Sequence, residues 1–237
     1  MEIGGFQRVS LIDYPGKVTS IVFLTGCNLR CPFCHNPDLV FKKAENLRLY
    51  PEEEILELLE KSRKFIDAVE ITGGEPSLQK DLREFIKKCK ALGLSVKLDT
   101  NGSNPRLVKD LITERLVDYV AMDIKAPLSK EAQEKATGIV DIGMADKLAE
   151  TAKILMGSRI NYEFRTTAAP SIVTPEDLLR IAYSIRGAKS YYIQQFVPGK
   201  TLNPSFSSIL PYPASKLERM RDIILGEKLV ERCSVRY

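Results

Sequence analysis

Short apolar runs alternate with longer amphipathic segments along this chain. The runs are rich in Val, Ile, Leu and aromatic residues, which is typical of buried strands, whereas the amphipathic segments space their apolar residues three to four apart, which is typical of helices. Strands are predicted at Val18–Leu24, Ala68–Thr72, Ser95–Leu98, Tyr119–Asp123, Ile160–Arg165 and Tyr191–Phe196. Helices are predicted at Pro51–Lys64, Lys80–Ala91, Asn104–Ile112, Met144–Met156, Pro175–Ile185 and Pro213–Leu225.

Capping residues support these boundaries. Asn104 and Thr174 have the side chains preferred at a helix N-cap, and each precedes a proline, which suits the first helical position. Gly93 and Gly157 follow the ends of two other helices. Such glycines commonly end a helix.

The alternation amounts to six βα units, which predicts an α/β fold with parallel strands and helices outside. Six units are too few for a full eight-stranded barrel, so the candidates are an open, partial (β/α)6 barrel and a doubly wound sheet. We expect one domain over 1–237, with an N-terminal extension (1–17), a core (18–200) and a C-terminal extension (201–237).

Composition excludes several other classes of protein. The 237 residues are 44% hydrophobic, and 35 Lys and Arg against 31 Asp and Glu leave a net charge of +4. This small excess is spread along the chain and does not indicate nucleic-acid binding. No apolar run is long enough to cross a membrane, and the first residues do not resemble a signal peptide.

Three of the five cysteines share one loop directly after the first predicted strand. Cys27, Cys31 and Cys34 have the spacing C-x3-C-x2-C. Three thiolates on a short loop suit three corners of a four-iron cluster, which leaves the fourth iron open to a small molecule. The alternative is a structural zinc, with His35 as a fourth ligand. Such sites usually take a second pair of ligands from elsewhere in the chain, and Cys89 and Cys233 form no obvious pair.

Polar motifs follow the other predicted strands. They are Gly73-Gly74-Glu75-Pro76, Asp99-Thr100-Asn101-Gly102, Asp123 with Lys125, Arg165, and Gln194 with Gln195. In parallel α/β folds the carboxyl ends of the strands lie on one face, so we expect these motifs to converge there. Taken singly, they are also compatible with turns and surface ion pairs.

The cysteine loop, with Phe33 before its last cysteine, resembles that of radical S-adenosylmethionine (SAM) enzymes. Its continuation, Cys34-His35-Asn36-Pro37, is similar to that of the glycyl-radical-enzyme activases. The resemblance is closest to the activating proteins of anaerobic ribonucleoside-triphosphate reductase, of the longer type close to pyruvate formate-lyase activase. Further similar segments are Ser10–Gly16, Met122–Lys125, Tyr162–Arg165 and Gln195–Gly199. The resemblance implies the partial barrel.

The resemblance also implies a role for each motif. Cys27, Cys31 and Cys34 would hold a [4Fe-4S] cluster, and no side-chain acid or base is needed. Asp99, Thr100 and Asp123, with the carbonyl of Ala121, would hold a monovalent cation, Na+ or K+. Lys125 would neutralise the SAM carboxylate, and Glu75 would shape its loop. The residues expected to contact SAM are Phe33, Gly73, Gly74, Glu75, Pro76, Asp99, Asn101, Lys125, Arg165 and Gln195.

The chain departs from pyruvate formate-lyase activase near the last predicted strand. That family has a SAM-contacting histidine there, whereas the only histidine of this chain is His35. A ring stack from Phe196 or a hydrogen bond from Gln195 is expected to substitute for it. No cysteine lies between Cys34 and Gly73, so we expect a single cluster.

The implied reaction is reductive cleavage of SAM to methionine and a 5′-deoxyadenosyl radical, which takes a hydrogen atom from a glycine of a partner protein. The expected partners are a glycyl radical enzyme and a flavodoxin- or ferredoxin-type electron donor, and the expected compartment is the cytoplasm. We also expect residues 126–141 to act as a mobile flap. The alternatives are a radical SAM reaction on a small molecule or nucleoside, such as that of 7-carboxy-7-deazaguanine synthase, and a non-enzymatic zinc- or cluster-binding protein.

Overall fold

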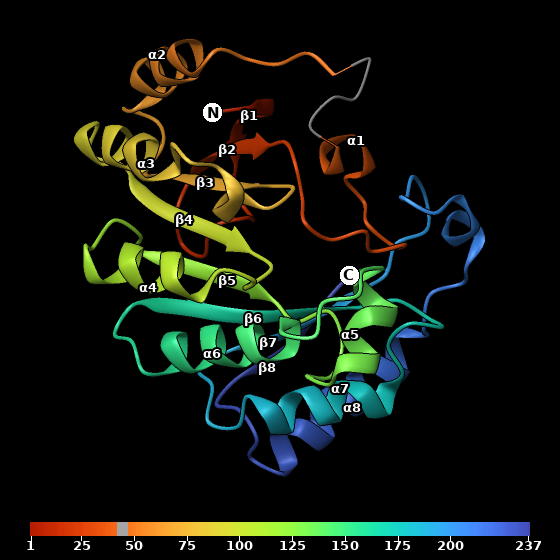
Figure 1. Cartoon of the computed structure of the whole chain (residues 1–237). Helices are drawn as coiled ribbons and strands as arrows, with labels where there is room; N and C mark the ends of the chain where they lie inside the picture. The colour runs from red at the N-terminus through yellow and green to blue at the C-terminus, as the bar shows by residue number, and fades with distance from the viewer. Residues whose placement is uncertain (42–46) are drawn as a thin grey trace. The chain divides into compact units, whose positions relative to one another are not determined.

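The computed structural model describes residues 1–41 and 47–237 as an α/β structure (Figure 1). Its eight strands follow one another in chain order in the hydrogen-bonded sheet. The first pair is antiparallel, and the pairs β2–β3, β3–β4, β6–β7 and β7–β8 are parallel. The residues form two compact units, which are described separately below. Unit 1 is Met1–Asn28, Asp38–Thr100 and Arg106–Val120, and unit 2 is Leu29–Pro37, Asn101–Pro105 and Ala121–Tyr237.

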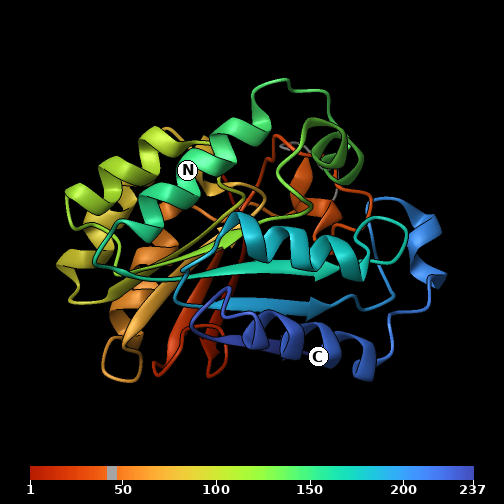
Figure 2. The ribbon, with the colours of Figure 1, turned by 90° about the horizontal axis from the view of Figure 1, so that it is seen from below.

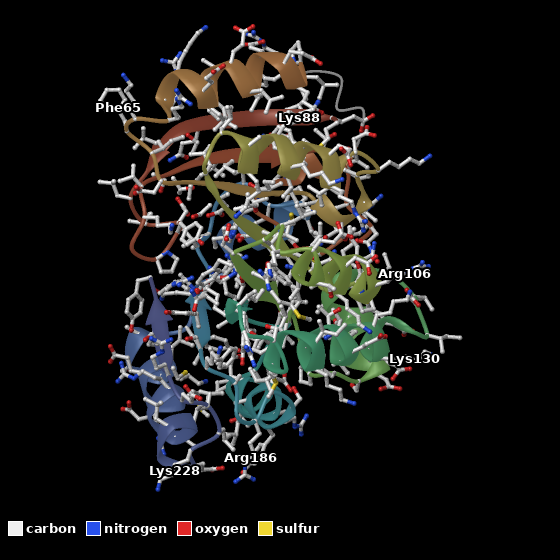
Figure 3. All side chains as sticks on the ribbon, turned by 90° about the vertical axis from the view of Figure 1, so that its left-hand side faces the viewer. Phe65, Lys88, Arg106, Lys130, Arg186 and Lys228 are labelled. Atoms are coloured by element: carbon white, nitrogen blue, oxygen red, sulfur yellow. The ribbon has the colours of Figure 1, made fainter. Side chains whose placement is uncertain are left out.

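Unit 1 is built on four strands with helices packed against them. The strands are β1 (Ile3–Ser10), β2 (Thr19–Leu24), β3 (Ala68–Gly73) and β4 (Ser95–Thr100), and the helices are α2 (Glu52–Ser62), α3 (Leu82–Ala91) and α4 (Pro105–Thr113). Helix α3 buries Leu82, Phe85, Ile86 and Cys89, which share one face because they are three or four residues apart. Lys88, labelled in Figure 3, donates to Glu52 of α2 at 2.7 Å.

Unit 2 contains the remaining strands and four longer helices. The strands are β6 (Asn161–Ala168), β7 (Tyr191–Gln195) and β8 (Cys233–Arg236), and the helices are α5 (Lys130–Thr137), α6 (Met144–Met156), α7 (Pro175–Ser184) and α8 (Ala214–Gly226). Helices α7 and α8 pack on each other and against β6, β7 and β8 (Figure 2). Thr174 caps α7, because its side chain accepts from the N–H of Asp177 while the Asp177 carboxylate accepts from the N–H of Thr174. Strand β5 (Tyr119–Asp123) has residues in both units.

The predicted alternation of strands and helices is confirmed, with boundaries shifted by a few residues. The pattern missed strands β1 and β8, helix α5 and the short helix α1 (Pro37–Val40), together with two 3₁₀ helices at Pro76–Leu78 and Pro204–Ser208. Strand β1 contains Gly4 and Gly5, which lack the side chains that signal a strand, and β8 is only four residues long. Within the described residues, no helix combines the length and apolar character needed to span a membrane.

Cys89 gives the stability of the protein a dependence on alkaline pH. Burial in α3, with a smaller effect from the charge of Glu52, raises the pKa of its thiol to about 12, from 9.0 in the unfolded chain. Between these values the unfolded state binds fewer protons than the folded state, so the free energy of unfolding falls as pH rises, by up to about 1.4 kcal/mol per pH unit. We expect Cys89→Ala to make this decline shallower in urea unfolding of the cluster-free, reduced protein between pH 8 and 10.5. Equal slopes for the two proteins would contradict this assignment.

Candidate functional site

The Gly73-Gly74-Glu75-Pro76 loop of unit 1 packs closely against the end of β2. The N–H of Gly74 donates to the carbonyl of Leu24, and the N–H of Glu75 donates to the carbonyl of Gly26, both at 2.8 Å. A Cβ on Gly74 would lie 2.2 Å from the Gly26 oxygen, and Gly73 has a φ of +116°. Glycine is therefore required at both positions by the approach of the backbone.

Glu75 is fully buried and joins this loop to strand β4. Its Oε1 accepts from the N–H of Ser77 at 3.0 Å and from the hydroxyl of Thr100 at 2.7 Å. These bonds fix the carboxylate in place between the two segments. This geometry suits the expected role of Glu75 in shaping the loop.

Asp99 lies beside a buried lysine that the sequence analysis did not single out. Lys97 is 2% exposed, and its ammonium lies 2.8 Å from Asp99 and 2.9 Å from Glu70 of the neighbouring strand β3. Lys97 and Asp99 share one face of β4 because they are two residues apart. A charged residue within an apolar strand is the signal that would have identified Lys97.

The cysteine loop passes from unit 1 to unit 2. In unit 1, the N–H of Cys27 donates to the carbonyl of Val40 at 3.0 Å. In unit 2, the N–H of Cys34 donates to the carbonyl of Cys31 at 3.0 Å, and the carbonyl of Cys34 accepts from the N–H of Leu202 at 3.1 Å. Phe33 is buried, and none of the three cysteines is in a disulfide.

Helix α5 supports the part of the loop that lies in unit 2. The N–H of Arg30 donates to the carbonyl of Thr137 at 2.6 Å. Gly138 ends the helix at a φ of +66°, and a Cβ there would lie 2.5 Å from the Arg30 oxygen. The stretch expected to be a flap therefore contains a capped helix that is hydrogen-bonded to the cysteine loop.

Asp123, Lys125 and Arg165 come together in unit 2. Asp123 pairs with Arg165 Nε at 2.8 Å and with Lys125 Nζ at 3.1 Å. Burial acts to raise the pKa of Asp123, but the charges of Arg165 and Lys125 outweigh it and hold that pKa well below its usual range. Burial likewise acts to lower the pKa of Lys125, but the negative charges of Asp123, Cys31 and Cys34 raise it above its usual value.

The sequence predicted that Arg165 ends its strand, and this prediction is wrong. Strand β6 continues to Ala168, because Thr166, Thr167 and Ala168 pair with Ile193, Gln194 and Gln195 of β7. The threonines are β-branched and suit a strand, although they interrupt the apolar pattern. Asp123 and Gln195 do end their strands, as expected.

The two residues expected to replace the family's histidine both have partners within unit 2. The amide of Gln195 donates to the carbonyl of Tyr212 at 2.9 Å. The buried Phe196 stacks on His35, with ring centroids 5.5 Å apart. The His35 Nε2 lies 2.9 Å from the carbonyl of Val197, so the imidazole links the cysteine loop to the segment after β7.

The turn after β4 is held by its own side chain, within unit 2. The Oδ1 of Asn101 accepts from the N–H of Ser103 at 2.9 Å, and the carbonyl of Gly102 accepts from the hydroxyl of Thr151 at 2.7 Å. Asn101 thus forms the turn that its sequence predicted. Its contact with SAM stays a prediction.

The chemistry of the donors fits the cofactors that the sequence predicts. Three cysteines on one loop, none of them in a disulfide, suit iron. The glycines at positions 73 and 74 are accounted for by the close approach of the end of β2. Within residues 1–41 and 47–237, no three His, Cys, Asp or Glu side chains are grouped as ligands of a single metal ion.

Residues 21–161, more than half of the chain, match the family model of the radical SAM superfamily. A protein of Methanocaldococcus jannaschii, named as a glycyl-radical enzyme activating enzyme, is 31% identical over 99% of this chain and 95% of its own length. The pyruvate formate-lyase-activating enzyme of Clostridium pasteurianum is 28% identical over 95% of this chain and 92% of its own.

Solved structures share the fold. SuiB of Streptococcus suis superposes with a TM-score of 0.69 at 15% identity, over 92% of this chain and 49% of its own. Coproporphyrinogen III oxidase of Escherichia coli, described as a radical SAM enzyme, has a TM-score of 0.56 at 14% identity, over 92% of this chain and 54% of its own. The chain thus spans about half of each solved chain. The expected fold class, a radical SAM core of the partial-barrel type, is confirmed.

Proposed function

The chain belongs to the radical SAM superfamily, and from that premise we propose that it is the activating enzyme of a glycyl radical enzyme. The observation that carries the proposal is similarity along almost the whole chain to proteins named as such activating enzymes. The Cys34-His35-Asn36 continuation of the cysteine loop supports the same assignment. The finer proposal is that the partner is anaerobic ribonucleoside-triphosphate reductase.

The cofactors of the superfamily are a [4Fe-4S] cluster and SAM. When bound, they supply a 5′-deoxyadenosyl radical, formed with methionine on one-electron reduction, which takes a hydrogen atom from the substrate. We assign three irons of the cluster to Cys27, Cys31 and Cys34. Lys125 suits the SAM carboxylate, because its raised pKa keeps the ammonium charged.

The protein positions SAM rather than supplying an acid or base. We assign the SAM amino group to the Gly73–Pro76 loop, which the buried Glu75 holds in shape. Arg165, held by Asp123, is assigned to the polar groups of SAM. Phe33, Asp99, Asn101 and Gln195 complete the proposed contacts.

The three side chains proposed as cation ligands all have protein partners. Lys97 pairs with Asp99, Arg165 and Lys125 pair with Asp123, and Thr100 donates to Glu75. A monovalent cation that binds either carboxylate would therefore compete with the ammonium or guanidinium groups paired with it.

The proposed partners are the glycyl radical enzyme and a flavodoxin- or ferredoxin-type electron donor, in the cytoplasm. A hydrogen atom would pass from the Cα of one glycine of the partner to the 5′ carbon, which would give 5′-deoxyadenosine and a glycyl radical. Such a transfer requires the glycine segment of the partner to approach the reactive carbon closely.

To test this, we would reconstitute the protein anaerobically, add reductant, SAM and the reductase of the same organism, and record electron paramagnetic resonance spectra. We expect a glycyl radical signal and a matching amount of 5′-deoxyadenosine, with no radical signal when the acceptor glycine is replaced by alanine. SAM cleavage without a radical on the reductase would contradict that partner. If other glycyl radical enzymes also failed, a small-molecule substrate would replace the activase proposal.

A further inference from the structure

Five side chains of alternating charge form a continuous row in unit 2. They come from β5 and the residues that follow it, from β6 and from β8. The contacts run from Lys125 to Asp123 (3.1 Å), from Asp123 to Arg165 (2.8 Å), from Arg165 to Glu163 (4.0 Å) and from Glu163 to Arg236 (2.8 Å). The row connects the proposed SAM site with the last strand.

The middle of this row is removed from solvent. The Glu163 side chain is 1% exposed and that of Arg165 is 12% exposed, whereas Arg236 at the outer end is 36% exposed. Charges in such surroundings interact more strongly than charges on the surface, and a buried carboxylate that loses its partner is costly. The charge of Arg236 therefore affects Arg165, which Arg236 reaches only through Glu163.

Arg165 lies between two carboxylates that compete for its guanidinium. Asp123 accepts a hydrogen bond from Arg165 Nε at 2.8 Å, whereas Glu163 lies 4.0 Å from Arg165 Nη1. Arg236 donates to both oxygens of Glu163, at 2.8 and 2.9 Å, so this carboxylate already has a bidentate partner. A bidentate pair of this kind is among the stronger side-chain contacts.

Arg236 is itself held in position. Its guanidinium carbon lies 3.5 Å from the centre of the Tyr192 ring, on the neighbouring strand β7. Strands β7 and β8 pair in parallel, with Gln194 opposite Arg236. The ring contact and the sheet together leave the guanidinium facing Glu163.

We propose that Glu163 and Arg236 are positioning residues for SAM: Arg236 occupies Glu163, so that Arg165 stays directed at Asp123. The proposal rests on the assignment of Arg165 to SAM made above. Without Arg236, Glu163 would attract Arg165 and draw it away from Asp123. Removing the charge of Glu163 as well would remove the competition and restore the contact between Arg165 and Asp123.

The test is the affinity for SAM of the reconstituted, unreduced protein, measured by equilibrium dialysis for R165M, R236M, E163Q and the double variant E163Q/R236M. R232M is the matched control, because Arg232 is exposed, precedes the same strand and loses the same charge. We expect R165M and R236M to weaken binding, R236M by about five- to tenfold. The double variant should bind within about twofold of the wild type.

Urea unfolding of the cluster-free variants separates positioning from stability. A purely structural role would lower the unfolding midpoint of R236M and leave the SAM affinity of the folded protein unchanged, which would overturn the proposal. It would also be overturned if R236M bound SAM as tightly as R232M, or if the double variant bound as weakly as R236M. If R165M had no effect, the assignment of Arg165 would fail and this inference with it. The activase proposal would then still be tested independently by the glycyl radical signal.

Discussion

Cys31→Ala should abolish both cluster binding and SAM cleavage. Cys31 is 5% exposed, and its carbonyl accepts from the N–H of Cys34, so it lies within the folded part of the loop. A cluster that has lost one of three thiolate ligands has two open irons and is not retained. We expect iron to fall from about four atoms per chain to near zero after anaerobic reconstitution. No 5′-deoxyadenosine should form.

Cys89→Ala is the matched control for this experiment. Cys89 is a buried thiol of α3, remote in sequence from the loop, and its removal should leave iron content and SAM cleavage intact. Cys31→Ala protein with full iron content and normal SAM cleavage would refute the assignment of the loop as the cluster site. Equal losses in both variants would refute a specific role for Cys31.

Gly138→Ala should disrupt the cysteine loop from a distance of more than 100 residues along the chain. The new Cβ would lie 2.5 Å from the carbonyl oxygen of Arg30, the residue immediately before Cys31. Both atoms belong to or adjoin the backbone, so relief requires movement of the helix end or of the loop. We expect the iron content after reconstitution to fall more than about tenfold below that of the wild type.

Gly93→Ala is the control that separates the clash with Arg30 from the strain of a left-handed backbone. Gly93 has a φ of +81°, close to the +66° of Gly138, but a Cβ there would meet nothing within 4 Å. Both substitutions therefore carry the cost of a left-handed alanine, about 1 kcal/mol. Only Gly138→Ala should lose iron, and an equal loss in both variants would show that the contact with Arg30 does not support the loop.

The sequence by itself determined the order of strands and helices, and it predicted three cysteine ligands for iron. Strands such as Tyr119–Asp123 and helices such as Met144–Met156 were predicted with their observed boundaries, because apolar spacing and caps act over a few residues. The three cysteines were singled out in the same way, since their spacing is local, and their role as iron ligands stays a prediction. The turn at Asn101 was predicted because its side chain bonds to the backbone two residues on.

Only the tertiary structure decided how distant residues support the site. Helix α5 has a polar sequence and was not predicted. In the structure, Ser129 caps it and its Thr137 carbonyl accepts from the N–H of Arg30. Arg165 was expected at a strand end, but pairing with β7 extends the strand by three residues. Lys97 pairs with Glu70 of a neighbouring strand, and Glu163 pairs with Arg236 of another strand. No local sequence pattern encodes such buried pairs. The fold thus decides which of the many charged residues pair with one another.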